Sequence, residues 1–77
     1  MIEIMLREAM DAYEARTGER LTYADLADRT GLSRATIESM AARPGYNASL
    51  KAIDLLCDAL RCELVALLRR SDTNREP

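Results

Sequence analysis

The stretch YADLADRTGLSRATIESM, residues 23–40, places two short amphipathic segments on either side of a single glycine. Two short helices joined by a tight turn cross steeply, with their backbones close together. Such a crossing requires a small residue on the first helix, here Ala27, and a residue that tolerates a positive φ in the turn, here Gly31. Apolar side chains must then hold the second helix. The stretch predicts two crossing helices with a shared core of Leu26, Ala27, Gly31, Leu32, Ile37 and Met40.

Polar residues before each apolar segment mark where these helices begin. Thr22 is followed three residues later by Asp25, which is the pattern of a capping box with Asp in place of the usual Glu. Ser33 is placed to cap the second helix, over residues 34–42. The sequence therefore predicts that the second helix starts directly after the turn.

The rest of the chain also reads as helical. Apolar residues at helical spacing over residues 2–16 predict a first helix, with Glu3 and Arg7 as an ion pair on its exposed side. Ser49 is placed to cap a helix over residues 50–60, whose inward residues include Leu50. A short fifth helix is predicted over residues 63–70, and no segment is read as a strand. We expect an all-α fold of five helices over residues 1–70 and a disordered tail over residues 71–77.

Composition limits the classes of function. The 77 residues are 48% hydrophobic and only 4% aromatic, which favours small, closely packed helices. No apolar run approaches the roughly 20 residues of a membrane span, and the N-terminus lacks the layout of a signal peptide, so the expected compartment is the cytoplasm. The net charge of −2 argues against nucleic acid, although binding depends on one face and not on the total.

The residues of catalysis and metal binding are scarce. The chain has no His, no Gly-rich phosphate loop and no paired carboxylates in a plausible pocket, so no enzyme activity and no cofactor are expected. On one continuous helix, Cys57 and Cys62 would be separated by about 140° of rotation and would point to different sides. We therefore expect no metal site and two reduced cysteines that act as small hydrophobic residues, while the sequence leaves a redox role of Cys62 open.

Two longer stretches carry a resemblance. LTYADLADRTGLSRATIESM, residues 21–40, and NASLKAIDLLCDALRCELVALL, residues 47–68, resemble the Cro/CI-type (Xre) helix-turn-helix family of bacterial and phage regulators. The resemblance implies a compact lambda-repressor-like domain that binds double-stranded DNA. The chain departs from the family pattern at Arg61, where glycine is usual, and at Glu63, where a serine cap is usual.

The resemblance also implies a DNA-contacting surface, because in that family the helix that begins at Ser33 lies in the major groove. The residues expected to contact base edges are Arg34, Ala35, Ser39 and Thr36. The residues expected to contact phosphates are Thr22, Tyr23, Ser33, Arg43, Tyr46 and Asn47. Three acidic residues near this surface, Asp25, Asp28 and Glu38, would repel phosphate if they pointed toward it.

Two expectations concern partners. Since one such module reads only a few base pairs, we expect a homodimer on a palindromic site, with Leu64, Leu67 and Leu68 at its interface. The alternative is a protein-interaction module, an antitoxin or scaffold that keeps the fold but binds little DNA. Low net charge favours this alternative, and Arg34, Arg43 and Asn47 oppose it.

Overall fold

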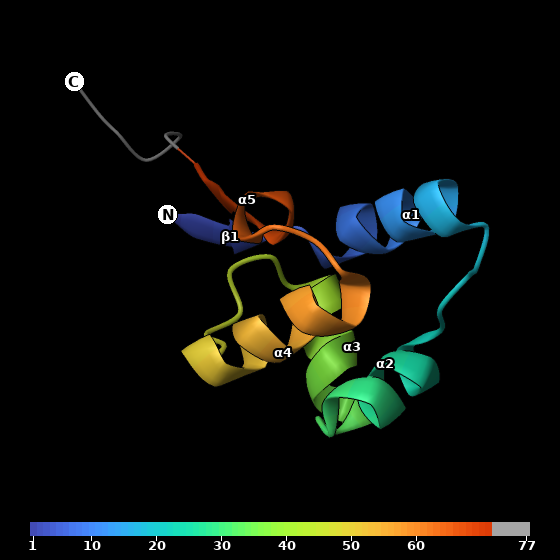
Figure 1. The fold of residues 1–77 in the computed structure, drawn as a ribbon. Coiled ribbons are helices and arrows are strands. Elements are labelled where there is room, and N and C mark those ends of the chain that lie inside the picture. Colours follow the sequence, from blue (N-terminus) through green and yellow to red (C-terminus); the bar gives the residue numbers. More distant parts are fainter. Residues whose placement is uncertain (72–77) are drawn as a thin grey trace.

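The computed structural model describes residues 1–71, and its five helices confirm the expected all-α fold class. Of the tail predicted over residues 71–77, residues 72–77 lie outside the described residues. Figure 1 shows the helices and two short strands in chain order. The elements are β1 (Ile2–Ile4), α1 (Leu6–Thr17), α2 (Tyr23–Thr30), α3 (Arg34–Ala42), α4 (Leu50–Leu60), α5 (Leu64–Leu67) and β2 (Leu68–Arg70).

One hydrophobic core joins all five helices. Every helix contributes at least one large side chain that is completely buried, and burying each of these side chains stabilises the fold by about 1.5–3 kcal/mol. The fully buried side chains are Leu6, Leu26, Ile37, Met40, Leu56, Leu60 and Leu67. A core divided among five short helices means that none of them is stable by itself.

Side-chain caps set the starts of three helices, as the sequence predicts. Thr22 and Asp25 form the capping box of α2. The Ser33 hydroxyl accepts a hydrogen bond from the backbone of Thr36 at the start of α3, and the Ser49 hydroxyl accepts one from Ala52 at the start of α4. Glu63, in contrast, makes no side-chain cap at the start of α5, which is only four residues long.

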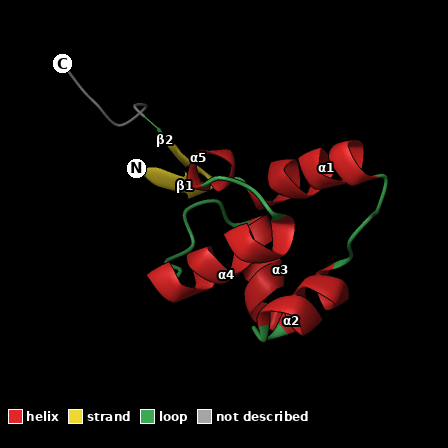
Figure 2. Cartoon of the chain, in the orientation of Figure 1, coloured by secondary structure: helices red, strands yellow, loops and turns green. Residues whose placement is uncertain are grey.

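The two ends of the described chain pair as a small antiparallel sheet, which the sequence reading missed. β1 lies beside β2 at one end of the molecule (Figure 2), with Glu3 opposite Arg69 and Ile4 opposite Leu68. The Arg69 guanidinium forms a salt bridge of 2.9 Å with the Glu3 carboxylate. Hydrogen bonds of 2.6 and 3.0 Å between the backbones of Met1 and Ser71 continue the pairing.

Helix predictions at both ends of the chain are therefore wrong in part. The first helix begins at Leu6 and not at residue 2, and the fifth ends at Leu67 and not at residue 70. The pattern Ile-Glu-Ile fits a strand as well as a helix over so few residues. Its partner strand lies more than 60 positions away, so Glu3 pairs with Arg69 and not with Arg7.

The inward orientation predicted for Leu50 is also wrong, because this side chain is 85% exposed. Leu50 is the first residue of α4 and faces away from the core, although Ala52 and Ile53 in the same turn are buried. Helical spacing thus identified the buried face of α4 but not where the core ends along it.

Three helices end in a residue of left-handed conformation. The positive φ angles are 77° at Gly18, 80° at Gly31 and 51° at Arg61. Glycine adopts this conformation without strain, whereas a residue with a Cβ pays roughly 1–2 kcal/mol. Arg61 therefore stores strain at the end of α4.

Substitutions at two of these ends should change stability in opposite directions. We expect Gly31→Ala to lower the free energy of unfolding by about 1 kcal/mol and Arg61→Gly to raise it by a similar amount. No atom lies within 4 Å of a Cβ built on Gly31, so the loss would reflect backbone strain alone. Urea unfolding followed by circular dichroism measures both changes. Destabilisation by Arg61→Gly would contradict the assignment of strain.

Candidate nucleic-acid interface

A tight turn sets the angle between α2 and α3. The backbone N–H of Gly31 donates to the carbonyl of Ala27 at 2.9 Å. The buried Thr30 hydroxyl donates to the carbonyl of Leu26 at 2.7 Å and accepts from the N–H of Leu32 at 3.1 Å. These bonds stabilise the turn in the conformation that sets this angle. The role of Thr30 was not foreseen in the sequence.

Apolar contacts hold the two helices together at this angle. Leu26, Ile37 and Met40 have no exposed surface, and Ala27 and Leu32 are partly buried against the same core. The predicted motif residues therefore lie where α2 and α3 pack together. They position a surface and form no part of it.

The N-terminus of α2 carries a reciprocal pair of hydrogen bonds. The N–H of Asp25 donates to the Thr22 hydroxyl at 3.1 Å, and the N–H of Thr22 donates to the Asp25 carboxylate at 2.9 Å. The hydrogen bond from the Thr22 backbone, followed by that with its side chain, lowers the pKa of Asp25 below its usual value. The carboxylate is thus committed to its own helix.

The outward face of α3 has a small and mixed set of side chains. Arg34 and Ala35, in its first turn, are exposed, and so are Glu38 and Ala42 further along. Thr36 and Ser39, which the sequence also proposed as base contacts, are half-buried. The Ser33 hydroxyl donates to the Thr36 hydroxyl at 2.8 Å, so these two residues are already bonded to each other.

Arg34 is paired within its own helix. Its Nε donates to a Glu38 carboxylate oxygen at 2.8 Å, and both side chains remain well exposed. An arginine at a helix N-terminus opposes the helix dipole, and a carboxylate four residues later offsets part of that cost. From the sequence, Glu38 is expected only to repel phosphate, although its spacing of four positions from Arg34 favours this ion pair.

The loop after α3 holds the remaining predicted contacts. Arg43 ends α3, and its guanidinium carbon lies 5.2 Å from the centre of the Tyr46 ring, within range of a cation–π contact. Tyr46 is half-buried and Asn47 is exposed. The N–H of Ile4 donates to the Pro44 carbonyl at 2.7 Å, so β1 holds this loop in place.

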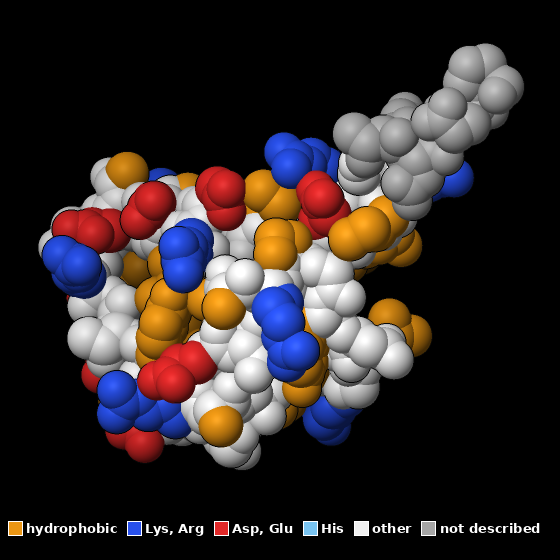
Figure 3. Space-filling view, turned by 180° about the vertical axis from the view of Figure 1, so that it is seen from behind, with side chains coloured by type: hydrophobic (Ala, Val, Ile, Leu, Met, Phe, Trp, Pro, Cys, Tyr) orange, Lys and Arg blue, Asp and Glu red, His pale blue; other side chains and the backbone are white. Residues whose placement is uncertain are grey.

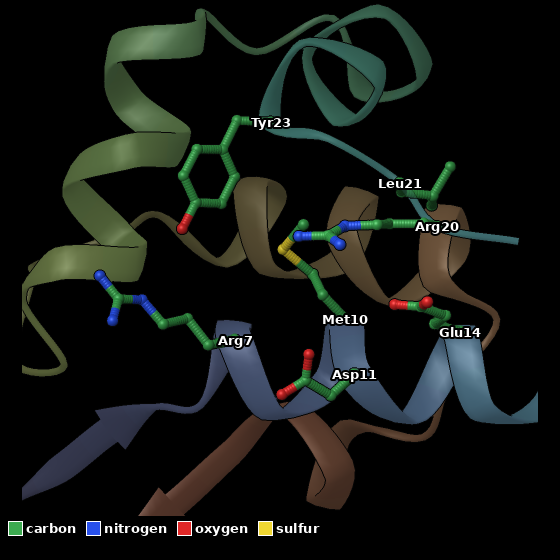
Figure 4. A pocket seen from close by; sticks show the side chains of 7 residues that line it. All are labelled: Arg7, Met10, Asp11, Glu14, Arg20, Leu21 and Tyr23. Atoms are coloured by element: carbon green, nitrogen blue, oxygen red, sulfur yellow. The ribbon is translucent and has the colours of Figure 1, made fainter.

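A hollow of about 360 Å³ adjoins the start of α2 (Figure 4). The Tyr23 hydroxyl points toward the Arg7 side chain of α1, and Arg20 extends across the hollow above Met10. Asp11 lines the α1 side of the same hollow. Arg7 and Arg20 place two positive charges near the predicted contact Tyr23, and Asp11 and Glu14 place two negative charges in the same hollow. Arg20 is close to Tyr23 in the chain, whereas only the fold brings Arg7 of α1 to this hollow.

Charge on the surface is mixed. Figure 3 shows Lys and Arg side chains scattered among Asp and Glu side chains on the face seen from behind, with no continuous basic area. Among residues 1–71, no group of three or more Cys, Asp or Glu side chains is arranged to hold a metal ion. No helix in the described part of the chain is long and apolar enough to cross a membrane.

Together the capped α2, the glycine turn and the outward α3 define a helix-turn-helix domain. The family of the Cro/C1-type HTH DNA-binding domain matches residues 18–72, and the chain belongs to this family. At the level of the family, the protein is a DNA-binding regulator of transcription whose partner is double-stranded DNA. Comparisons with curated proteins and with solved structures found no significant match.

The lowered pKa of Asp25 predicts how the capping box responds to acid. A carboxyl group whose pKa is lowered on folding stabilises the fold above its usual pKa of 3.8 and loses this effect as the pH falls through the lowered value. We expect wild type to be more stable than Asp25→Asn at neutral pH, with the difference disappearing well below pH 3.8. Urea unfolding over this pH range measures it. A difference that stays constant would show that the charge is unimportant.

Proposed function

We propose that the protein is a sequence-specific repressor whose α3 lies in the major groove of duplex DNA. The observation that carries the proposal is the position of Arg34 and Ala35. Both are exposed in the first turn of α3, immediately after a turn in which Gly31 has a positive φ and Thr30 makes two hydrogen bonds. Helix-turn-helix proteins read bases with this part of the second helix.

Arg34 is the principal base contact in this proposal. Glu38 accepts from its Nε, which leaves the two terminal nitrogens of the guanidinium to donate to O6 and N7 of a guanine. Such a bidentate contact discriminates against a wrong base by roughly 1–3 kcal/mol. Ala35 offers a methyl contact to thymine. Thr36 and Ser39 are further proposed base contacts, although both are half-buried.

Phosphate contacts would position α3 on the duplex. We assign them to Thr22 and Tyr23 at the start of α2, to Ser33 before α3, and to the loop residues. The loop residues in this set are Arg43, Tyr46 and Asn47. Arg7 and Arg20 join them, because they line the hollow beside Tyr23. Since acidic side chains are scattered among these cations, we expect weak binding to DNA of unrelated sequence.

A homodimer would provide the second half-site. The surface proposed from the sequence needs correction at Leu67, which is completely buried in the monomer and has no area to offer a partner. Leu68 is half-buried in β2. Leu64 and Val65 of α5, 54% and 85% exposed, are the side chains that we assign to the contact. Burying them together would remove apolar surface from water on both copies.

Binding to DNA tests the two classes of contact separately. We expect selection from random duplexes to enrich one sequence, with affinity that falls steeply as salt rises. Arg34→Ala should lose preference at one base position at a cost of roughly 1–3 kcal/mol, whereas Arg43→Ala should weaken all sequences alike. Binding measured by fluorescence anisotropy at several salt concentrations distinguishes these outcomes.

A matched control uses the partner of Arg34. Glu38→Gln keeps a hydrogen-bond acceptor but removes the charge, so it should retain the base preference while binding every sequence more tightly. Absence of enrichment and of binding even at low salt would overturn the proposal. It would favour the alternative, a protein-interaction module that uses the same fold, for which the scattered acidic residues are the supporting observation.

The dimer is tested with two equally exposed residues. We expect Val65→Asp to shift the protein toward monomer in sedimentation velocity, because a charge would then lie in the proposed contact. Leu50→Asp serves as the control, since Leu50 has the same 85% exposure but belongs to α4. Equal behaviour of both variants and wild type would exclude α5 as the contact.

A further inference from the structure

The end of α4 brings the two cysteines of the chain together. Helix α4 stops at Leu60, and Arg61 takes the left-handed conformation. The N–H of Cys62 then donates to the carbonyl of Cys57 at 3.0 Å, and the N–H of Arg61 donates to the carbonyl of Asp58 at 3.3 Å. This pair of backbone bonds is a Schellman motif, in which the chain reverses after the last turn of the helix.

The Schellman motif corrects the expected separation of the thiols. On a continuous helix they would point to different sides, but the helix ends between them. In this motif, the residues at the positions of Cys57 and Cys62 commonly contact each other through their side chains. Both are free, half-buried and packed against the core, and both line one open hollow at this corner of the molecule.

The surroundings of Cys57 disfavour its thiolate form. Burial, with a further contribution from the neighbouring Cys62 thiol and then from Asp54 and Glu63, raises the pKa of Cys57. Cys57 is therefore protonated at neutral pH, and a protonated thiol is a poor nucleophile. The corner itself is anchored, because the Arg16 guanidinium donates to the carbonyl of Leu60 at 2.8 Å.

We propose that Cys57 and Cys62 form a reversible dithiol–disulfide centre that reacts with low-molecular-weight disulfides of the glutathione type. One of the two cysteines, as thiolate, attacks one sulfur of the oxidised disulfide, forms a mixed disulfide and releases one thiolate. The thiol of the other cysteine then loses its proton to solvent and attacks the protein sulfur of the mixed disulfide, which closes the Cys57–Cys62 bond and releases the second thiolate. Two protein thiols are oxidised, and one external disulfide is reduced to two thiols.

The geometry favours this chemistry over the other uses of paired thiols. A disulfide requires two α-carbons that already lie close together, and the backbone bond between these residues provides that closeness. A metal would need further ligands, and within residues 1–71 no group of three or more suitable side chains is present. The inference depends only on the corner between α4 and α5, so it is independent of DNA binding.

The full-length protein and oxidised glutathione test the proposal directly. After an acid quench and alkylation, mass spectrometry should show a species that has lost two hydrogen atoms, carries no glutathione and takes up no alkylating reagent. Dithiothreitol should restore both alkylatable thiols. Stable glutathione adducts, or two thiols that remain alkylatable, would overturn the proposal.

Single-cysteine variants test the two steps separately. Cys57→Ser and Cys62→Ser should each accumulate a stable glutathione adduct on the remaining thiol, because the resolving thiol is absent. Absence of an adduct in both variants would overturn the mixed-disulfide step.

Two variants at Arg61 test whether the left-handed turn causes the pairing. Arg61→Gly keeps this conformation and should form the disulfide as fast as wild type. Arg61→Val disfavours it and should slow ring closure by about fivefold, with the first step unchanged. Circular dichroism confirms that each variant is folded. Should the valine variant not fold, the cysteine variants still test whether the disulfide forms through the two proposed steps.

Discussion

The left-handed conformation of Gly31 is the constraint on which the proposed DNA surface depends. It ends α2 after two turns and sends the chain directly into α3, so that Leu26, Ile37 and Met40 meet in one core. The buried Thr30 hydroxyl both donates and accepts a hydrogen bond within the turn, so this polar group is buried with its partners. Because these hydrogen bonds and buried contacts join α2 to α3, they set the position of the exposed α3 side chains relative to α2.

The net negative charge is compatible with a role in DNA recognition, because two of the three acidic side chains expected near the surface are hydrogen-bonded to other groups of the protein. Asp25 accepts a hydrogen bond from the backbone of Thr22, and Glu38 accepts one from Arg34. A carboxylate that is paired within its own helix repels phosphate less than an unpaired one. In the proposed complex, the mixed charge of the surface weakens the attraction to phosphates of unrelated DNA, so discrimination depends more on base contacts.

Two chain reversals, and not the helices alone, position the side chains on which the two proposals for this small domain depend. The turn at Gly31 presents the start of α3, while the turn at Arg61 brings Cys62 back to Cys57. The second reversal uses a residue that is strained in this conformation. Strain of this kind persists only when the surrounding structure holds it, and Arg16 does so by binding the last carbonyl of α4.

The sequence by itself determined the five helices, the three side-chain caps and the crossing of α2 and α3. These features depend on residues within a few positions of one another, such as Thr22 with Asp25 or Ala27 with Gly31. The spacing of four positions also favours the salt bridge between Arg34 and Glu38, although from the sequence Glu38 is expected only to repel phosphate.

Only the tertiary structure decided the strand pairing of the two chain ends, the hollow beside Tyr23 and the meeting of the two cysteines. Strand pairing joins residues more than 60 positions apart, and a three-residue strand is stable only beside its partner. The cysteines meet because α4 ends at Leu60 instead of continuing, and the left-handed Arg61 there is held by contacts with α1. Local patterns carry no information about such distant contacts, so these features arise only when the whole chain is folded.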